Sequence, residues 1–300
     1  MPSYISHAIM GEELYEKARK DENLFKINIS KEELKGYSLG IDLSLLSKNI
    51  IKDPQNSNTR EFFIKMLKYI KENKLIEKDS VISLLYGHIA HYFLDINTHP
   101  FIYYIEIGCQ KAGLISNHNL VEGYLSSYLA NTILDKDIME IKSEYFNHLN
   151  LSDIQISKLL NSIYGEIYGD YQIVKTYRRT LGIFNMLENI IKSGLFSKEQ
   201  LIKLSGFNKF LEINSLTLSE ITNENHNIYT NPITGKKKSE SFIELYDKSI
   251  EMTLEAILLV NKYLYSDAPL ETLEPVFSDL SYDTGVPCSE GKKFAYVRKK

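Results

Sequence analysis

Tryptophan is absent from this 300-residue sequence, and cysteine occurs only twice, as Cys109 and Cys288. The two cysteines are far apart and lie outside any C-x-x-C spacing, which argues against a disulfide framework or a thiolate zinc site. We therefore expect two reduced cysteines packed among other side chains.

Long apolar runs and an excess of one charge are also missing. No apolar run approaches the roughly 20 residues of a membrane span, and the opening lacks the basic start and apolar stretch of a signal peptide. Lys and Arg total 35 and Asp and Glu total 39, giving a formal net charge of −4 with both signs interspersed. This balance suggests neither duplex DNA nor an anionic membrane as an electrostatic partner. The sequence predicts a soluble, cytoplasmic protein without a stable nucleic-acid partner.

Helical periodicity is the main pattern that is present. Hydrophobic residues make up 43% of the chain, enough to bury a core. In Thr59–Glu77 they fall on one helix face, while Lys and Glu fill the other. Similar amphipathic stretches are Ile156–Ile167, Leu181–Ile191 and Phe242–Tyr265. The sequence therefore predicts an all-α, multi-helix fold.

Local signals add helix starts and irregular segments to this prediction. Capping-box spacing, in which a hydroxyl and a side-chain carbonyl satisfy free backbone N–H groups, occurs at Ser30…Glu33, Ser152…Gln155 and Ser197…Gln200. The Asn, Pro and Gly content between Thr222 and Ser239 predicts an ordered loop or short hairpin. The tail after Asp267 is irregular, and we expect it to wrap the helical body.

A stripe of histidines and one carboxylate carries the first chemical signal. His88, His91, Asp95 and His99 follow a helical spacing and would share one face of a helix. Pro100 is expected to end this helix near His99, because proline disfavours helical backbone in the residue before it.

The spacing of His91 and Asp95 recurs in His118 and Glu122. Residues four apart on a helix have Cβ atoms about 5–6 Å apart, so an imidazole and a carboxylate can bind one cation together. In the alternative interpretation, each histidine is hydrogen-bonded in the core and the acid is its partner. A charged Asp95 among apolar neighbours is costly to bury unless paired or metal-bound, and the repeated pair favours metal.

Five segments, in this order, are similar to those of a known family: PSYISHAIMG, GYSLGIDLS, NTREFFIKMLKYIKENK, GHIAHYFLDINTHPFIYY and HNLVEGYL. Together they resemble the bacterial zinc-dependent phospholipase C family over residues 1–180. The resemblance implies an all-α fold with two to three zinc ions, related to fungal single-strand nucleases that hydrolyse phosphodiesters with a similar site. We expect a metal domain at 1–180 and a helical C-terminal extension at 181–300, packed on it as one unit.

The resemblance also implies the metal ligands. His91 with Asp95 and His118 with Glu122 match the family's H-x-x-x-D and H-x-x-x-E motifs. The whole implied set is His7, Asp42, His91, Asp95, His99, His118 and Glu122. Asp42 and Glu122 are also expected to accept a proton during catalysis. His88 has no family counterpart, and we interpret it as a packed histidine.

Gln55 is a departure from the family pattern, because relatives usually carry a histidine ligand at this position. A neutral amide oxygen binds zinc less well than imidazole does, so one metal is expected to be weakly held or absent. His88 as a replacement ligand is a further hypothesis.

The sequence thus predicts a zinc-dependent hydrolase of phosphodiester bonds. The first interpretation is a phospholipase C that acts on a phospholipid head-group linkage with metal-activated water. The alternatives are a nuclease or nucleotidase with the same cluster, and a non-catalytic metal-binding protein weakened by Gln55. The sequence does not indicate an oligomeric state.

Overall fold

The computed structural model describes residues 3–111, 118–138, 141, 148–192, 218–266 and 268–291. Within these ranges the fold consists of α-helices, short 3-10 turns and a two-stranded antiparallel sheet. The predicted all-α fold class is confirmed. None of the helices in these ranges has both the length and the apolar character of a membrane span. The cellular location stays a prediction.

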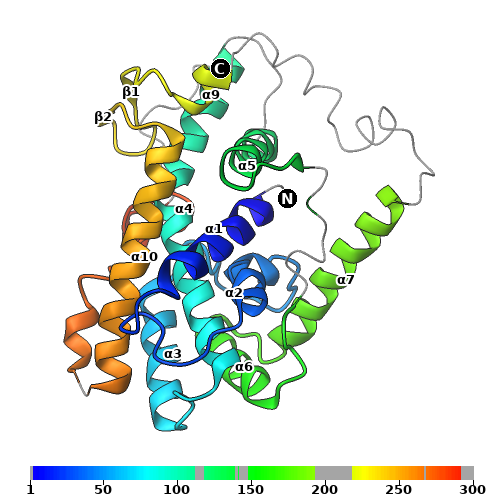
Figure 1. The fold of residues 1–300 in the computed structure, drawn as a ribbon, viewed down its shortest axis with the longest axis vertical. Helices are drawn as coiled ribbons and strands as arrows, with labels where there is room; N and C mark the ends of the chain where they lie inside the picture. The colour runs from blue at the N-terminus through cyan, green and yellow to red at the C-terminus, as the bar shows by residue number, and fades with distance from the viewer. Residues whose placement is uncertain are drawn as a thin grey trace.

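A long central helix, α4 (Asp79–Lys111), organises the fold (Figure 1). Neighbouring elements pack around it on several sides: α1 (Ser3–Ala18), α2 (Lys31–Tyr37), η1 (Gly40–Ser44), α5 (His118–Leu134), α6 (Ile154–Tyr168) and α10 (Phe242–Tyr265). Apolar side chains of α4 are buried all around its middle, as expected for a helix enclosed by others. Polar residues in the middle of α4 therefore face protein rather than water.

Pro100 does not end this helix, so that prediction is wrong: α4 continues to Lys111 with Pro100 inside it. Proline has no N–H to donate to the carbonyl four residues earlier, which leaves the Ile96 carbonyl outside the helical ladder. Gly285 packs against this carbonyl so closely that an added Cβ would collide with the Ile96 oxygen. Packing from a distant segment thus covers the gap in the helix.

The remaining elements complete the body around α4. They are α3 (Thr59–Glu72), α7 (Ile173–Lys192), α9 (Leu218–Thr222), β1 (Tyr229–Thr230), β2 (Lys237–Lys238), η6 (Leu270–Leu273) and η7 (Cys288–Glu290). The helix predicted to run from Thr59 to Glu77 ends at Glu72, because the chain turns through Lys74 at φ 54°. The hairpin predicted between Thr222 and Ser239 is confirmed as β1 and β2.

The helix caps agree only in part with the sequence signals. Ser30 accepts a hydrogen bond from the Glu33 N–H at 3.3 Å, as predicted. The cap of α6 is Asp153 rather than Ser152, with Asp153 Oδ1 accepting from the Gln155 N–H at 2.6 Å. A carboxylate accepts more strongly than a hydroxyl, which explains the one-residue shift. The Ser197…Gln200 pair lies outside the described residues.

Residues 268–291 wrap the helical body, as predicted. Leu273, Phe277 and Tyr282 are buried, and the Phe277 ring stacks on Phe63 with centroids 4.4 Å apart. Neither cysteine forms a disulfide: Cys109 is buried and Cys288 is partly buried. The division of the chain into two domains at residue 180 stays a prediction.

A capping box that the sequence analysis missed starts α10. Ser241 Oγ accepts from the Glu244 N–H, while the Glu244 carboxylate accepts from the Ser241 N–H at 2.9 Å. We expect Ser241→Ala to lower the free energy of unfolding by about 1 kcal/mol, because one N–H at the helix start loses its partner. Urea denaturation measures this change. Ser239→Ala, at an exposed position two residues earlier, is the control and should change stability by much less.

Candidate metal centre

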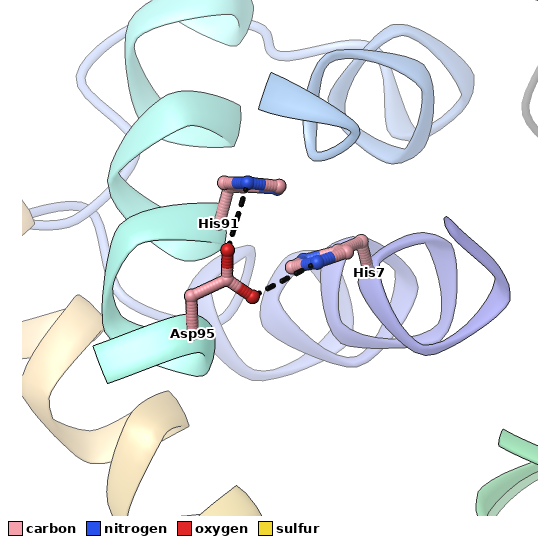
Figure 2. Close-up of side chains that lie close together, drawn as sticks. All are labelled: His7, His91 and Asp95. Atoms are coloured by element: carbon pink, nitrogen blue, oxygen red, sulfur yellow. Dashed lines mark ion pairs between the residues drawn. The ribbon is translucent and has the colours of Figure 1, made fainter. Parts of the chain in front are cut away.

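One buried carboxylate, Asp95, meets two histidines from different helices (Figure 2). His7 Nε2 of α1 lies 3.2 Å from Asp95 Oδ1, and His91 Nε2 of α4 lies 3.1 Å from Asp95 Oδ2. The two imidazole rings stack with centroids 3.9 Å apart. All three side chains are buried, and their ligand atoms lie close enough to hold one cation. We call His7, His91 and Asp95 the first group.

Backbone packing fixes the His91 ring in this position. Its Nδ1 contacts the Ser38 carbonyl oxygen at 3.1 Å. Gly40, with φ 48°, lies directly against the ring: an added Cβ would be 2.5 Å from His91 Cγ. The turn that carries Asp42 can therefore approach α4 only because position 40 has no side chain.

A second group forms one turn further along α4, where α5 comes close. Glu122 Oε1 lies 3.1 Å from His118 Nε2 and 3.3 Å from His99 Nε2. Their ligand atoms again lie within reach of one cation. His99 and Glu122 are buried, while the His118 side chain is 27% exposed. We call His99, His118 and Glu122 the second group.

The two groups are neighbours. His99 Nε2 is 4.0 Å from Asp95 Oδ1, so Asp95 faces histidines of both groups. A cavity of about 20 Å³, lined by His7, Asp95, His99 and Glu122 among others, lies where they meet. This volume holds about one water molecule. Asp42 lies at the edge of the first group, with Oδ1 3.9 Å from His91 Nε2 and its side chain 19% exposed.

The structure thus brings all seven sequence-predicted ligands into one region of the fold. It adds what spacing does not give, namely that His7 joins His91 and Asp95, and that His99 joins His118 and Glu122. His88 is in neither group. Its Nδ1 contacts the Leu84 carbonyl at 2.9 Å, and its ring stacks on Phe62. Burial lowers the pKa of His88 to about 3, which fits a neutral packed imidazole.

The carboxylates of the two groups are stabilised in their charged form. Burial alone would raise the pKa of Asp95, but the three nearby imidazoles hold it well below its usual range. Burial likewise opposes ionisation of Glu122, yet hydrogen bonds from His118 and His99 lower its pKa to about 2. Burial would lower the pKa of His99, whereas Asp95 and Glu122 raise it to about 10. Burial raises the pKa of Asp42 despite the nearby His91.

The donor atoms fit a bound zinc ion. His91 Nδ1 faces the Ser38 carbonyl and His99 Nδ1 faces the Tyr282 carbonyl, so these nitrogens carry the proton in each neutral ring. The Nε2 atoms then present lone pairs towards carboxylate oxygens. Two acceptors that face each other need either a proton or a cation between them. Imidazole nitrogen and carboxylate oxygen are ligands that zinc prefers, and a carbonyl on the other ring nitrogen is the usual support.

Gln55 lies beside Asp42. Its Nε2 donates to Asp42 Oδ1 at 3.4 Å, so the side-chain amide lies next to one of the predicted ligands. Sequence reasoning missed the carbonyls of Ser38 and Tyr282, because a backbone acceptor leaves no signal in residue type. Gly40 lies in the GYSLGIDLS segment, but residue type alone does not indicate its positive φ or its contact with the His91 ring.

The chain is similar to a known protein family. A family model described as zinc dependent phospholipase C matches residues 3–177, a range that contains all seven predicted ligands. No curated protein and no solved structure matches the chain.

We expect Gly40→Ala to weaken zinc binding by at least about tenfold, because the new Cβ would push the His91 ring away from Asp95. Competition with a chromophoric chelator measures the affinity. Gly108→Ala is the control, because Gly108 lies on the same helix as His91 and an added Cβ there meets no atom of the described residues within 4 Å. Equal zinc affinity in both variants would contradict a ligand role for His91.

Proposed function

We propose a phospholipase C reaction for this chain, which belongs to the zinc-dependent phospholipase C family. The bond cleaved would be the phosphodiester that links a phospholipid head group to its glycerol backbone. The observation that carries the proposal is Asp95, a buried carboxylate that faces His7, His91 and His99. The packing of helices alone does not require three histidines, which are common zinc ligands, around one buried carboxylate.

Two to three zinc ions are proposed. The first group would hold one ion and the second group another, with Asp95 close to both. Asp42 would complete the coordination at the edge of the first group. A third ion would need ligands besides the side chains of these groups, so we propose two well-held ions and a weaker one.

Bound zinc lowers the pKa of a coordinated water towards about 7 and so supplies a nucleophile at neutral pH. Residues of the chain would balance the charge of the ions and orient the ligands. The buried carboxylates of Asp95 and Glu122 balance the cationic charge, and the carbonyls of Ser38 and Tyr282 hold His91 and His99 in the tautomer that leaves Nε2 free.

Asp42 is the better placed of the two proposed proton acceptors. Its side chain is 19% exposed, whereas that of Glu122 is 8% exposed and is shared by two histidines. A group that exchanges a proton with substrate or water needs this access. We propose that Asp42 accepts the proton and that Glu122 acts mainly as a ligand.

The first test is metal content. We expect protein produced with added zinc to contain about two ions per chain by mass spectrometry, in line with the two groups. Asp95→Asn should reduce this content and lower zinc affinity at least about tenfold, because a neutral amide replaces the carboxylate that both groups share. Circular dichroism checks that the variant keeps its helices.

Asp79→Asn is the matched control, since Asp79 is exposed at the start of the same helix and its carboxylate accepts from the neighbouring Ser80 N–H at 2.9 Å. It should retain full zinc content. Wild-type protein that holds no zinc after supplementation would contradict the metal centre itself.

The second test separates the candidate substrates and uses Gln55→His. We expect the wild-type protein to hydrolyse phosphatidylcholine and not single-stranded DNA. The reverse result would favour a nuclease. Gln55→His should raise zinc affinity and the rate of hydrolysis roughly tenfold, because imidazole beside Asp42 is a better zinc ligand than an amide. Gln172→His, at an exposed position before α7, controls for the added histidine.

If the protein binds stoichiometric zinc but hydrolyses neither substrate, the interpretation as a non-catalytic metal-binding protein is the one supported. Failure of Gln55→His to change zinc affinity would show that position 55 does not face the ion.

A further inference from the structure

The C-terminal segment, which we define as residues 277–288, lies beside both groups of ligands. It starts 100 positions after the family match ends at residue 177. Nothing in the match therefore accounts for it. Its Phe277 and Tyr282 side chains are buried in the core shared with α3 and α4, so it belongs to the folded body.

The strongest contact of this segment with the centre is a backbone carbonyl. His99 Nδ1 lies 2.7 Å from the Tyr282 oxygen, a shorter contact than that of His91 with Ser38 at 3.1 Å. Because a carbonyl only accepts, the Nδ1 carries the proton and Nε2 is turned towards Glu122. The tautomer and the ring orientation of a predicted ligand thus depend on the position of Tyr282.

Several contacts fix Tyr282 itself. Its N–H donates to the Gln55 carbonyl at 2.9 Å. Its ring packs against Tyr92, with centroids 5.1 Å apart, and lies 5.6 Å from the ring of His91. The segment therefore contacts a histidine of each group, one through its carbonyl and one through its ring.

Asp283 extends the same arrangement to His118. Its carboxylate accepts from Tyr103 Oη at 2.8 Å and from Asn56 Nδ2 at 2.9 Å. The Tyr103 ring in turn lies against the His118 ring, with centroids 4.7 Å apart. Asp283 thus holds the Tyr103 ring, which packs against His118, the partly exposed histidine of the second group.

Gly285 sets how closely the segment approaches α4. It has φ 65°, closes the turn by donating to the Ser281 carbonyl at 2.8 Å, and packs against the Ile96 carbonyl that Pro100 leaves free. A side chain at position 285 would both strain the turn and collide with that carbonyl. Displacing Gly285 would move the Tyr282 carbonyl, which is three residues away in the same turn.

We propose that the C-terminal segment is a positioning element of the metal centre, with the Tyr282 carbonyl orienting His99 and Asp283 supporting His118 through Tyr103. The inference rests on the proposed function, since it takes zinc as the cation. The centre is then assembled from both ends of the chain, because His7 comes from α1 and the supports of the second group come from residues 282–283.

The test compares two glycines of the same tail. Gly285 and Gly291 have nearly the same backbone angle, φ 65° and 66°. An added Cβ meets Ile96 at Gly285, whereas at Gly291 it meets no atom of the described residues within 4 Å. Gly285→Ala should weaken zinc binding about 10–100-fold, the range typical of a lost support for a ligand. Gly291→Ala should change it less than about threefold. Zinc affinity is measured by chelator competition and apo-protein stability by thermal melting.

A second set of variants tests the proposed positioning role if Gly285→Ala does not fold. Asp283→Ala should weaken zinc binding about tenfold, and Asp283→Asn, which keeps an acceptor for Tyr103, should recover most of the loss. Asp153→Ala is the control for a purely structural role, because Asp153 lies outside the segment and its Oδ1 caps α6 by accepting from the Gln155 N–H at 2.6 Å. This variant should melt at a lower temperature with unchanged zinc affinity.

Wild-type protein that binds zinc, with Gly285→Ala and Asp283→Ala binding it equally well, would overturn this inference alone. Wild-type protein that binds no zinc would overturn the proposed function and the inference together.

Discussion

The buried charge of Asp95 is the constraint on which the rest of the structure depends. A carboxylate removed from water is stable only when opposite charge or strong donors surround it. Here the partners come from two helices, His7 on α1 and His91 and His99 on α4. The crossing of α1 over α4 therefore has to place His7 at one turn of α4 and no other. Gly40 permits a further close approach to α4, that of the η1 turn that carries Asp42.

The continuation of α4 through Pro100 follows from the same need. His99 reaches Glu122 of α5 from a helix that goes on beyond it, so the two groups are held at a fixed distance by one rigid element. The Ile96 carbonyl that proline leaves free is covered by Gly285. One irregularity in the helix thus becomes the contact point for the segment whose Tyr282 carbonyl orients His99.

The sequence predicted what depends on local spacing and could not predict what depends on how helices cross. The His91 and Asp95 pair, the all-α class and the exact bounds of α10 follow from periodicity within one segment. The meeting of His7 with Asp95 joins residues 88 positions apart, and nothing in either segment specifies it. The prediction that Pro100 ends the helix was wrong because the rule for proline considers only neighbouring residues. The carbonyl that Pro100 leaves without a helical partner is covered by a residue far along the chain, at position 285. The identity of the metal ligands stays a prediction, supported by the family match.

Gln55 shows how a site can change while the fold around it does not. Its backbone carbonyl accepts from the Tyr282 N–H at 2.9 Å, and this bond is independent of the side chain. Its side-chain amide points to Asp42, at the partly exposed edge of the first group. The fold therefore uses the backbone of residue 55 and leaves its side chain to the site. A change of side chain there would leave this backbone contact in place, so the departure from the family pattern that we predict at this position is compatible with the two groups that the structure brings together.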